Sequence, residues 1–253
     1  MSNVMANHYR QVFQHSLVQK SGYFNYGWWT FDIRNSADAS ERLVDELWHF
    51  GGGNAGNQGP RILDVACGVG ACSSRIAQLS GGDVLGVNVD GWQVEVARKR
   101  FPGLRFEVMD AVRLEAEAES FDVITCVEAA FHFRARKDFL REAFRVLRPG
   151  GRLLIADVLF GDNIGLDEGI FPKENCGISL SGYNVLLGEA GFQRGKTQTL
   201  DVTSMTWKPF REQLARAVLS EEYAPEERKQ LVEFIITRSL NVQSYVFVGA
   251  RKP

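Results

Sequence analysis

The feature of this sequence that most constrains its fold is a glycine loop that follows an apolar run, ILDVACGVG at residues 62–70. The apolar run predicts a buried strand, and Gly68 and Gly70 allow the backbone to bend tightly and a ligand to approach it closely. In an open parallel sheet, ligands bind at the carboxyl ends of the strands, where the strand order reverses. The sequence therefore predicts a ligand site at this loop.

The loop excludes one class of ligand site and leaves two open. A phosphate-binding P-loop requires Gly-Lys followed by Ser or Thr, and the loop at residues 66–74 does not contain this sequence. The dinucleotide fingerprint requires a third glycine, but Ser73 stands at that position and Ala66 is the first small residue. By spacing alone, a nucleoside and a dinucleotide both remain compatible with the loop.

Strand and helix patterns alternate around the loop. Strands are predicted at residues 61–67, 83–89, 104–110, 121–129 and 152–160, and helices at 71–79, 90–101 and 136–151. A helix at 179–192 and two strands that could pair antiparallel, at 195–203 and 242–252, follow them. We therefore predict an α/β fold with right-handed crossovers. It is a Rossmann-like, doubly wound, mostly parallel seven-stranded sheet with an antiparallel C-terminal strand pair and helical lid insertions.

A glycine- and asparagine-rich break at residues 50–61 separates two parts of the chain. We predict an N-terminal helical and aromatic lid segment at residues 1–59, with a helix at about 36–49 capped by Ser36 or Asp38. The core, residues 60–253, would contain a helical insertion at about 204–240.

The aromatic stretch SGYFNYGWW at residues 21–29 allows two interpretations. Its rings could anchor a loop onto the sheet by burial. Alternatively, Tyr23, Tyr26 and Trp29 could form a lid that covers a cofactor and walls an acceptor pocket. An apolar, aromatic pocket suits a bulky acceptor better than a small polar metabolite.

Composition and charge narrow the possible partners. The net charge is −2, so no basic surplus predicts binding to nucleic acid. No apolar run is long enough to span a membrane, and the polar N-terminus lacks the apolar core of a signal peptide. Cys67, Cys72, Cys126 and Cys176 have no zinc-module spacing. We therefore expect a cytoplasmic protein with reduced thiols and no metal.

Residues after the third predicted strand point to adenosine. Asp110 and Ala111 could offer a carboxylate and a backbone amide to an adenine amine and ring nitrogen. Over about residues 60–160 the chain resembles the class I S-adenosylmethionine-dependent methyltransferases of the small-molecule, natural-product type. Five motifs in register carry the resemblance: ILDVACGVG, VLGVNVDGWQVEVAR, FEVMDAVRL, SFDVITCVEAAFHF and FLREAFRVLRPGGRLLIAD. The resemblance implies S-adenosyl-L-methionine as cofactor and S-adenosyl-L-homocysteine as product.

The matched motifs imply a set of cofactor contacts. They are Asp64, Ala66, Cys67, Gly68, Gly70, Asn88, Gln93, Asp110, Ala111 and Glu128. Many family members end the second strand with an acid that holds both ribose hydroxyls, whereas this chain has Asn88 there and Asp90 two positions later. An asparagine can accept one hydroxyl hydrogen bond and donate another. Which of the two faces the ribose stays open, although the strand pattern favours Asn88. The resemblance also favours the lid interpretation of residues 21–29.

His132, in EAAFHFRAR after the fourth predicted strand, is the candidate general base. Imidazole titrates near neutral pH and can take a hydroxyl proton. The same side chain could instead cap a loop or pack between Phe131 and Phe133. The resemblance supports catalysis, because related small-molecule methyltransferases often carry a catalytic histidine at the matching place. Glu128 could contact the cofactor, orient a partner, or be a solvated or capping acid.

Asp157, at the end of the fifth predicted strand, has three interpretations. It could bind the substrate, act with His132, or pair with an arginine. Together with Asp162 it also leaves a metal site open, although no carboxylate cluster argues clearly for one.

These features predict a methyltransferase that acts on a bulky small-molecule acceptor, by O-methylation in natural-product biosynthesis with His132 as general base. The sulfonium methyl is already electrophilic, so the protein mainly has to orient and desolvate the nucleophile. Methylation at carbon or nitrogen, or a cyclase on the same fold, remain alternatives. A nicotinamide-dependent dehydrogenase is a further alternative, but the third glycine and a Tyr-x-x-x-Lys motif are absent.

Overall fold

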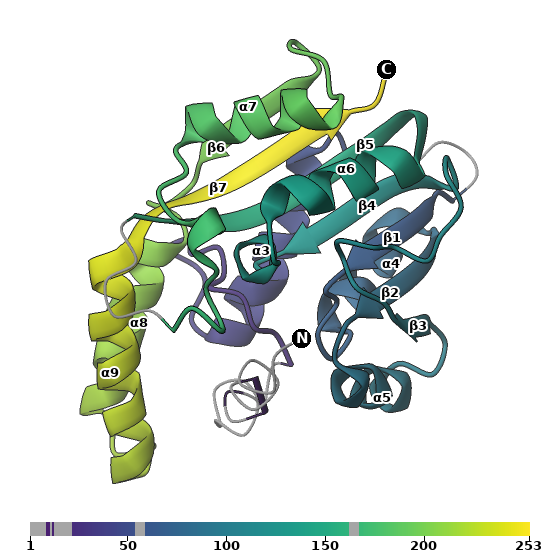
Figure 1. The fold of residues 1–253 in the computed structure, drawn as a ribbon. Helices are drawn as coiled ribbons and strands as arrows, with labels where there is room; N and C mark the ends of the chain where they lie inside the picture. Colours follow the sequence, from purple (N-terminus) through teal and green to yellow (C-terminus); the bar gives the residue numbers. More distant parts are fainter. Residues whose placement is uncertain (1–8, 11, 13–21, 54–58, 162–166) are drawn as a thin grey trace.

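The structure is a computed structural model and describes residues 9, 10, 12, 22–53, 59–161 and 167–253. Its centre is a seven-stranded sheet with the strand order β3-β2-β1-β4-β5-β7-β6 (Figure 1). The expectations for Asp162 and for most of residues 1–21 lie outside the described residues.

All seven predicted strands are present. They are β1 Arg61–Val65, β2 Asp83–Asn88, β3 Arg105–Val108, β4 Phe121–Val127, β5 Leu147–Phe160, β6 Thr197–Asp201 and β7 Val242–Arg251. Strands β1 to β5 pair in parallel, and β7 lies antiparallel between β5 and β6. The doubly wound, mostly parallel sheet with an antiparallel C-terminal pair is therefore confirmed. Strand order reverses between β1 and β4, which is where a ligand is expected.

Helices cover both faces of the sheet. They are α3 Ser36–Phe50, α4 Ala71–Ser80, α5 Gly91–Arg100, α6 Arg136–Val146, α7 Leu180–Ala190, α8 Trp207–Leu219 and α9 Pro225–Asn241. Helices α3, α4 and α5 pack on one face, and α6 and α7 pack on the other. Helix α6 turns an apolar face to the sheet, where Phe139, Ala143 and Val146 are fully buried.

Two predicted boundaries were wrong. Asn35, rather than Ser36 or Asp38, caps α3, because its side chain accepts a hydrogen bond from the backbone N–H of Asp38. The helix predicted at 136–151 ends at Val146. Pro149 cannot continue a helical hydrogen-bond pattern, and Gly150 has φ +77°, so β5 begins at Leu147. The predicted helical insertion at about 204–240 is present and consists of two helices, α8 and α9.

Helices α8 and α9 pack side by side at the start of β7 and project from the sheet (Figure 1). They reach the same side of the molecule as the carboxyl ends of the parallel strands. No helix among the described residues is long and apolar enough to cross a lipid bilayer.

Candidate functional site

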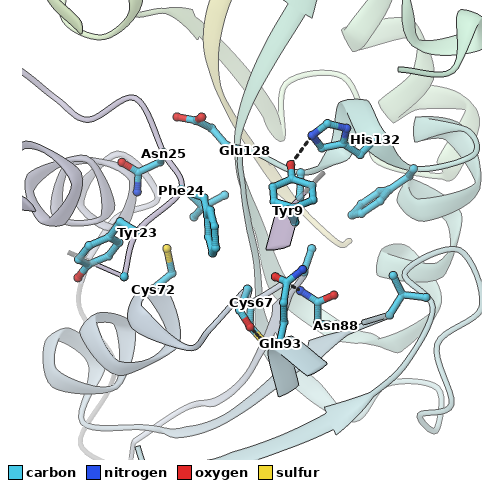
Figure 2. Close-up of a pocket in the computed structure, with 17 residues that line it drawn as sticks. Tyr9, Tyr23, Phe24, Asn25, Cys67, Cys72, Asn88, Gln93, Glu128 and His132 are labelled. Carbon is cyan, nitrogen blue, oxygen red and sulfur yellow. Dashed lines mark hydrogen bonds between the residues drawn. The ribbon is translucent and has the colours of Figure 1, made fainter. Parts of the chain in front are cut away.

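A cavity of about 90 Å³ lies at the carboxyl ends of β1, β2 and β4, at the point where the strand order reverses (Figure 2). The ends of these strands and the loops after them contribute Ala66, Cys67, Gly68, Asn88, Val89, Val127, Glu128 and Ala129. The N-terminal segment contributes Tyr9, Gly22, Tyr23, Phe24 and Asn25, and the remaining residues are Cys72, Gln93, His132 and Phe133. The site therefore forms where the glycine loop predicts it.

Gly68 and Gly70 are each required to be glycine, but for different structural reasons. Gly68 has φ +57°, and a Cβ there would lie 3.2 Å from the ring of Phe24 inside the cavity. Gly70 has φ +90°, and its Cβ would lie 2.9 Å from the rings of Phe101 and Phe106, away from the cavity. Gly68 thus leaves space in the site, whereas Gly70 permits close packing below it.

Asp64 lies beneath the loop and does not line the cavity. Its side chain is 1% exposed, and it accepts hydrogen bonds from Ser73 Oγ at 2.6 Å and Thr125 Oγ1 at 2.8 Å. Burial raises the pKa of Asp64 to about 6. In this arrangement Asp64 ties α4 and β4 to β1, and so supports the glycine loop from below.

Asn88 and Asp90, the two candidates at the end of β2, have different environments. Asn88 lines the cavity, donates to Gln93 Oε1 at 3.3 Å and accepts from the backbone N–H of Asp90 at 3.0 Å. Asp90 caps α5 by accepting from Trp92 N, and it also accepts from Gln93 Nε2. The geometry thus brings Asn88 and Gln93 into the cavity wall, while Asp90 orients them.

Asp110 and Ala111 follow β3 beside Asn88, since Asn88 pairs with Val108 in the sheet. Neither lines the cavity. Asp110 is exposed and accepts a hydrogen bond from Val112 N, whereas Ala111 is buried. The predicted adenine turn is therefore at the right edge of the sheet but outside the enclosed space.

Glu128 is buried in the cavity wall, so it is not a solvated acid. It accepts hydrogen bonds from Tyr26 N at 2.5 Å and from Tyr245 OH at 2.7 Å. Burial raises the pKa of Glu128 to about 8, although these two hydrogen bonds oppose the rise. Its carboxyl group thus connects the N-terminal segment to β7.

His132 lies on the side of the cavity opposite Asn88, and its ring has a defined orientation (Figure 2). It lies in the short 3₁₀ helix Ala130–His132 that follows β4. Its Nδ1 atom lies 2.7 Å from the carbonyl oxygen of Ile170, which can only accept, so Nδ1 carries a proton. In the neutral ring, Nε2 therefore carries the lone pair, and it accepts a hydrogen bond from the hydroxyl of Tyr9 at 2.5 Å (Figure 2).

The ring of His132 packs between Phe131 and Phe171 rather than between Phe131 and Phe133. The ring centroids lie 4.1 Å and 5.0 Å away, respectively. Phe133 instead packs edge-on against Phe139. This aromatic packing and the bond to Ile170 hold the imidazole with Nε2 toward the cavity.

The aromatic stretch 21–29 divides into cavity residues and anchoring residues. Tyr23 and Phe24 line the cavity. Tyr26 and Trp29 do not; Tyr26 stacks on Phe210 of α8 at 4.9 Å, and Trp29 donates to the carbonyl oxygen of Tyr26. The burial interpretation therefore holds for Tyr26 and Trp29, which are buried and do not line the cavity, whereas the lid role of the stretch stays a prediction.

Tyr9 and Phe24 are lining residues that the sequence reasoning missed. Phe24 belongs to the aromatic stretch at residues 21–29, and the density of aromatic residues in that stretch could have indicated that Phe24 lines the site. No pattern around Tyr9 distinguishes it from other residues of the N-terminus, and only the fold brings it to His132.

Cys67 and Cys72 both line the cavity, on either side of the glycine loop. Burial raises the pKa of both thiols well above the usual range, which disfavours a nucleophilic thiolate. Within the described residues, no three His, Cys, Asp or Glu side chains come together as metal ligands.

Asp157 pairs with an arginine, one of its three predicted roles. It is fully buried, lies 2.7 Å from Nε of Arg136, and also accepts from Tyr183 OH at 3.1 Å. Arg136 also donates to the carbonyl oxygens of Val158 in β5 and of Asn175 in the 3₁₀ helix Lys173–Asn175. The side-chain amide of Asn175 in turn donates to the carbonyl oxygens of Phe131 and Phe133, on either side of His132. This cluster supports the loop that contains His132 and does not line the cavity.

Comparisons with known proteins agree with this geometry. A family model described as a methyltransferase domain matches residues 63–155. Methyltransferase GfsG of Streptomyces halstedii is 40% identical over 143 residues, which are 53% of this chain and 50% of that relative. The chain thus spans about half the length of that relative.

A second relative aligns over nearly the whole chain. The 27-O-demethylrifamycin SV methyltransferase of Amycolatopsis mediterranei (strain S699) is 30% identical over 246 residues, covering 90% of this chain and 89% of the relative. Among solved structures, the [4+2]-cyclase SpnF has a TM-score of 0.75 at 23% identity, covering 96% of this chain and 93% of that one. The latter similarity shows a shared fold.

Proposed function

The chain belongs to the class I S-adenosylmethionine-dependent methyltransferases, and on that premise we propose that it methylates a hydroxyl group of a bulky natural product. The observation that supports this most directly is the lone pair of His132 Nε2, which already accepts a hydrogen bond from a hydroxyl, that of Tyr9. An acceptor hydroxyl in the same position would be able to give up its proton to His132.

The methyl donor is S-adenosyl-L-methionine, and the residues of the cavity fit such a ligand. When bound, it supplies an electrophilic methyl group. We propose that the space beside Gly68 takes its methionine portion and that the amides of Asn88 and Gln93 contact its ribose. The cavity of about 90 Å³ is smaller than ordinary ligand pockets of roughly 300–1,000 Å³ because the rings of Phe24 and Tyr9 project into it. Phe24 has to move away from Gly68 before the donor can bind.

His132 is proposed as the general base. Its proton on Nδ1 is held by the carbonyl of Ile170, so Nε2 can remove a hydroxyl proton as the oxygen attacks the methyl group. The carbonyl would also stabilise the imidazolium that forms. The rings of Phe131 and Phe171 limit the orientation of the imidazole and exclude water from the reacting atoms.

We further propose that residues 1–59 act as the lid of the site. Tyr23 and Phe24 line the cavity, and the backbone N–H of Tyr26 is bonded to Glu128. Tyr26 stacks on Phe210 of α8, and the backbone N–H of Trp29 donates to the carbonyl oxygen of Met205 just before α8, so both residues attach this segment to that helix. The acceptor chamber would then lie among the aromatic side chains of Phe131, Phe160, Phe171, Phe210 and Phe234, which favour an apolar acceptor.

The test is methyl transfer to a panel of hydroxylated polyketides and macrolactones. The purified protein is incubated with isotopically methyl-labelled S-adenosylmethionine, and the products are separated and weighed by mass spectrometry. The expected result is a product with one additional methyl group, equimolar release of S-adenosylhomocysteine, and a methyl carbon whose NMR shift is that of a methoxy group.

Other outcomes assign other chemistry. A methyl group on carbon or nitrogen would contradict O-methylation while leaving the family intact. A product that is an isomer of its substrate, with no S-adenosylhomocysteine released, would instead identify a cyclase on the same fold.

A further inference from the structure

Arg238, on α9, is a buried arginine whose Nη1 atom has no hydrogen-bond partner in the described part of the chain. Its side chain is 8% exposed. Arg136 gives the contrast, because this arginine, which is only 1% exposed, donates to Asp157 and to the carbonyl oxygens of Asn175 and Val158. Proteins rarely leave a buried charge unpaired, since the cost of removing it from water is then uncompensated.

The guanidinium of Arg238 lies in a cage of three phenylalanine rings. Its central carbon is 4.3 Å from the ring centroid of Phe171, 5.2 Å from that of Phe234 and 5.4 Å from that of Phe160. Such cation–π contacts are attractive but weaker than the lost hydration of a buried ion. The three rings hold the guanidinium in place, but they do not supply the negative charge that would neutralise it.

The cage contacts both sides of the proposed acceptor chamber, the side with His132 and the side with Tyr26. Phe171 also packs on the ring of His132, at 5.0 Å, and Phe234 packs edge-on against Tyr26, at 6.3 Å. Arg238 therefore lies between the side of the chamber that carries the proposed base and the side that anchors the N-terminal segment. Burial raises the pKa of Tyr9, Tyr26 and Glu128, and the positive charge of Arg238 opposes that rise in each case.

Glu128 is the nearby carboxyl group, but it does not neutralise Arg238. Its Oε1 atom already accepts from Tyr26 N and Tyr245 OH. Burial raises its pKa to about 8, so at neutral pH the carboxyl is mostly protonated. Within the described part of the chain, the positive charge of Arg238 thus has no partner carboxylate, and it lies beside the proposed acceptor chamber.

We propose that Arg238 binds an oxyanion, a carboxylate or a phosphate ester, on the acceptor molecule. The guanidinium fork matches the paired oxygens of either group, and the surrounding phenylalanines match an apolar body attached to it. This inference rests on the proposed function, and it narrows the acceptor to an amphiphilic acid rather than a neutral lipophilic alcohol.

The experiment measures binding, without turnover, to the full chain saturated with S-adenosylhomocysteine. The probes are 3-phenylpropanoate, phenethyl phosphate and the neutral 3-phenylpropanamide, whose Kd values are determined by calorimetry at pH 7. Wild type is expected to bind at least one of the two anions at least about tenfold more tightly than the amide, and the tighter anion identifies the group. Arg238→Met should abolish this preference, and Arg238→Lys should keep part of it.

Two controls separate this role from a structural one. Arg216→Met, the same change at an exposed arginine on α8, should keep the preference for the anion. The melting temperature of ligand-free Arg238→Met should be equal to or above that of wild type, because an unpaired buried charge has been removed. A fall of several degrees would show that Arg238 is a structural cation and would overturn the proposal.

The remaining outcomes are also decisive. Equal binding of anion and amide by wild type, or an unchanged preference in Arg238→Met, would overturn the assignment of Arg238 while S-adenosylhomocysteine still binds. Failure of S-adenosylhomocysteine to bind would instead contradict the proposed methyl transfer itself, so the two failures are distinguishable.

Discussion

The hydroxyl of Tyr9 lies 2.5 Å from Nε2 of His132, the atom proposed to take the acceptor proton (Figure 2). An acceptor hydroxyl and Tyr9 would therefore compete for the same lone pair. Tyr9→Phe keeps the ring that packs on Phe24 but removes the competing hydroxyl. We expect the KM for the acceptor to fall about fivefold, the equivalent of one neutral hydrogen bond, with kcat nearly unchanged.

Steady-state kinetics over a range of acceptor concentrations measure this effect, with Tyr223→Phe as the matched control. A fall in kcat of more than about tenfold in Tyr9→Phe would be inconsistent with simple competition. It would show that the phenol takes part in the proton transfer.

His132→Ala should lower kcat by roughly 100-fold or more, because general-base assistance is lost. The affinity for S-adenosylhomocysteine should stay nearly unchanged, since the imidazole is bonded to Ile170 and Tyr9 on the side of the cavity opposite Asn88 (Figure 2). His49→Ala, at an exposed position on α3, is the control and should be silent. An unaltered kcat in His132→Ala would remove this residue from the mechanism.

Gly68→Val should weaken binding of S-adenosylhomocysteine by about 100-fold or more. A branched side chain would fill the space next to Phe24, and a β-branched residue at φ +57° is strained. Calorimetry gives the affinity, and a thermal melt checks that the variant folds. Gly103→Val, where a Cβ would meet nothing within 4 Å, should bind normally. If the Kd of Gly68→Val for S-adenosylhomocysteine stayed within about threefold of the wild-type Kd, this result would contradict the proposed site.

Glu128 should make stability depend on pH. Its pKa is about 8 in the folded chain, mainly because of burial, against about 4.5 in the unfolded chain. The folded state therefore holds more protons between these values, and the free energy of unfolding falls as pH rises toward 8. The free energy of unfolding falls in total by an amount of the order of a few kcal/mol, and this loss is complete above the pKa of Glu128 in the folded chain.

Urea unfolding at pH 6.5 and pH 8.5 tests this expectation. That interval avoids Asp64, whose pKa of about 6 places its own change at lower pH. Glu128→Gln keeps an oxygen for Tyr26 N and Tyr245 OH but cannot ionise, so it should lose less stability over the interval than wild type does. Identical slopes in the two proteins would argue against a protonated Glu128.

Arg136→Met should lower the free energy of unfolding by about 3–5 kcal/mol, because it leaves Asp157 charged and unpaired in the core. Arg134→Met is the matched control, since Arg134 pairs with Asp138 at the surface with a side chain that is 78% exposed. That variant should change stability by no more than about 0.5 kcal/mol. Equal effects of the two substitutions on urea unfolding would mean that the buried pair has no special structural role.

Some features were determined by the sequence itself, because they depend on local physics. Apolar runs alternating with helical patterns predict a parallel sheet, and the loop at Gly68 and Gly70 predicts the ligand edge of that sheet. Backbone restrictions act within a few residues, so a strand, a glycine turn and a helix can be recognised from the chain alone. The placement of His132 after β4 follows from the same reasoning.

Only the tertiary structure decided which side chains meet across that edge. Asn88 rather than Asp90 faces the cavity because Asp90 is used to cap α5, and Asp157 is used by Arg136. Tyr9 reaches His132 over 123 positions of sequence. Contacts of this kind depend on how distant elements pack, and neither hydrophobic period nor residue spacing encodes them. The same physical reason explains why a buried arginine on α9, far along the chain from every motif, is found only in the folded protein.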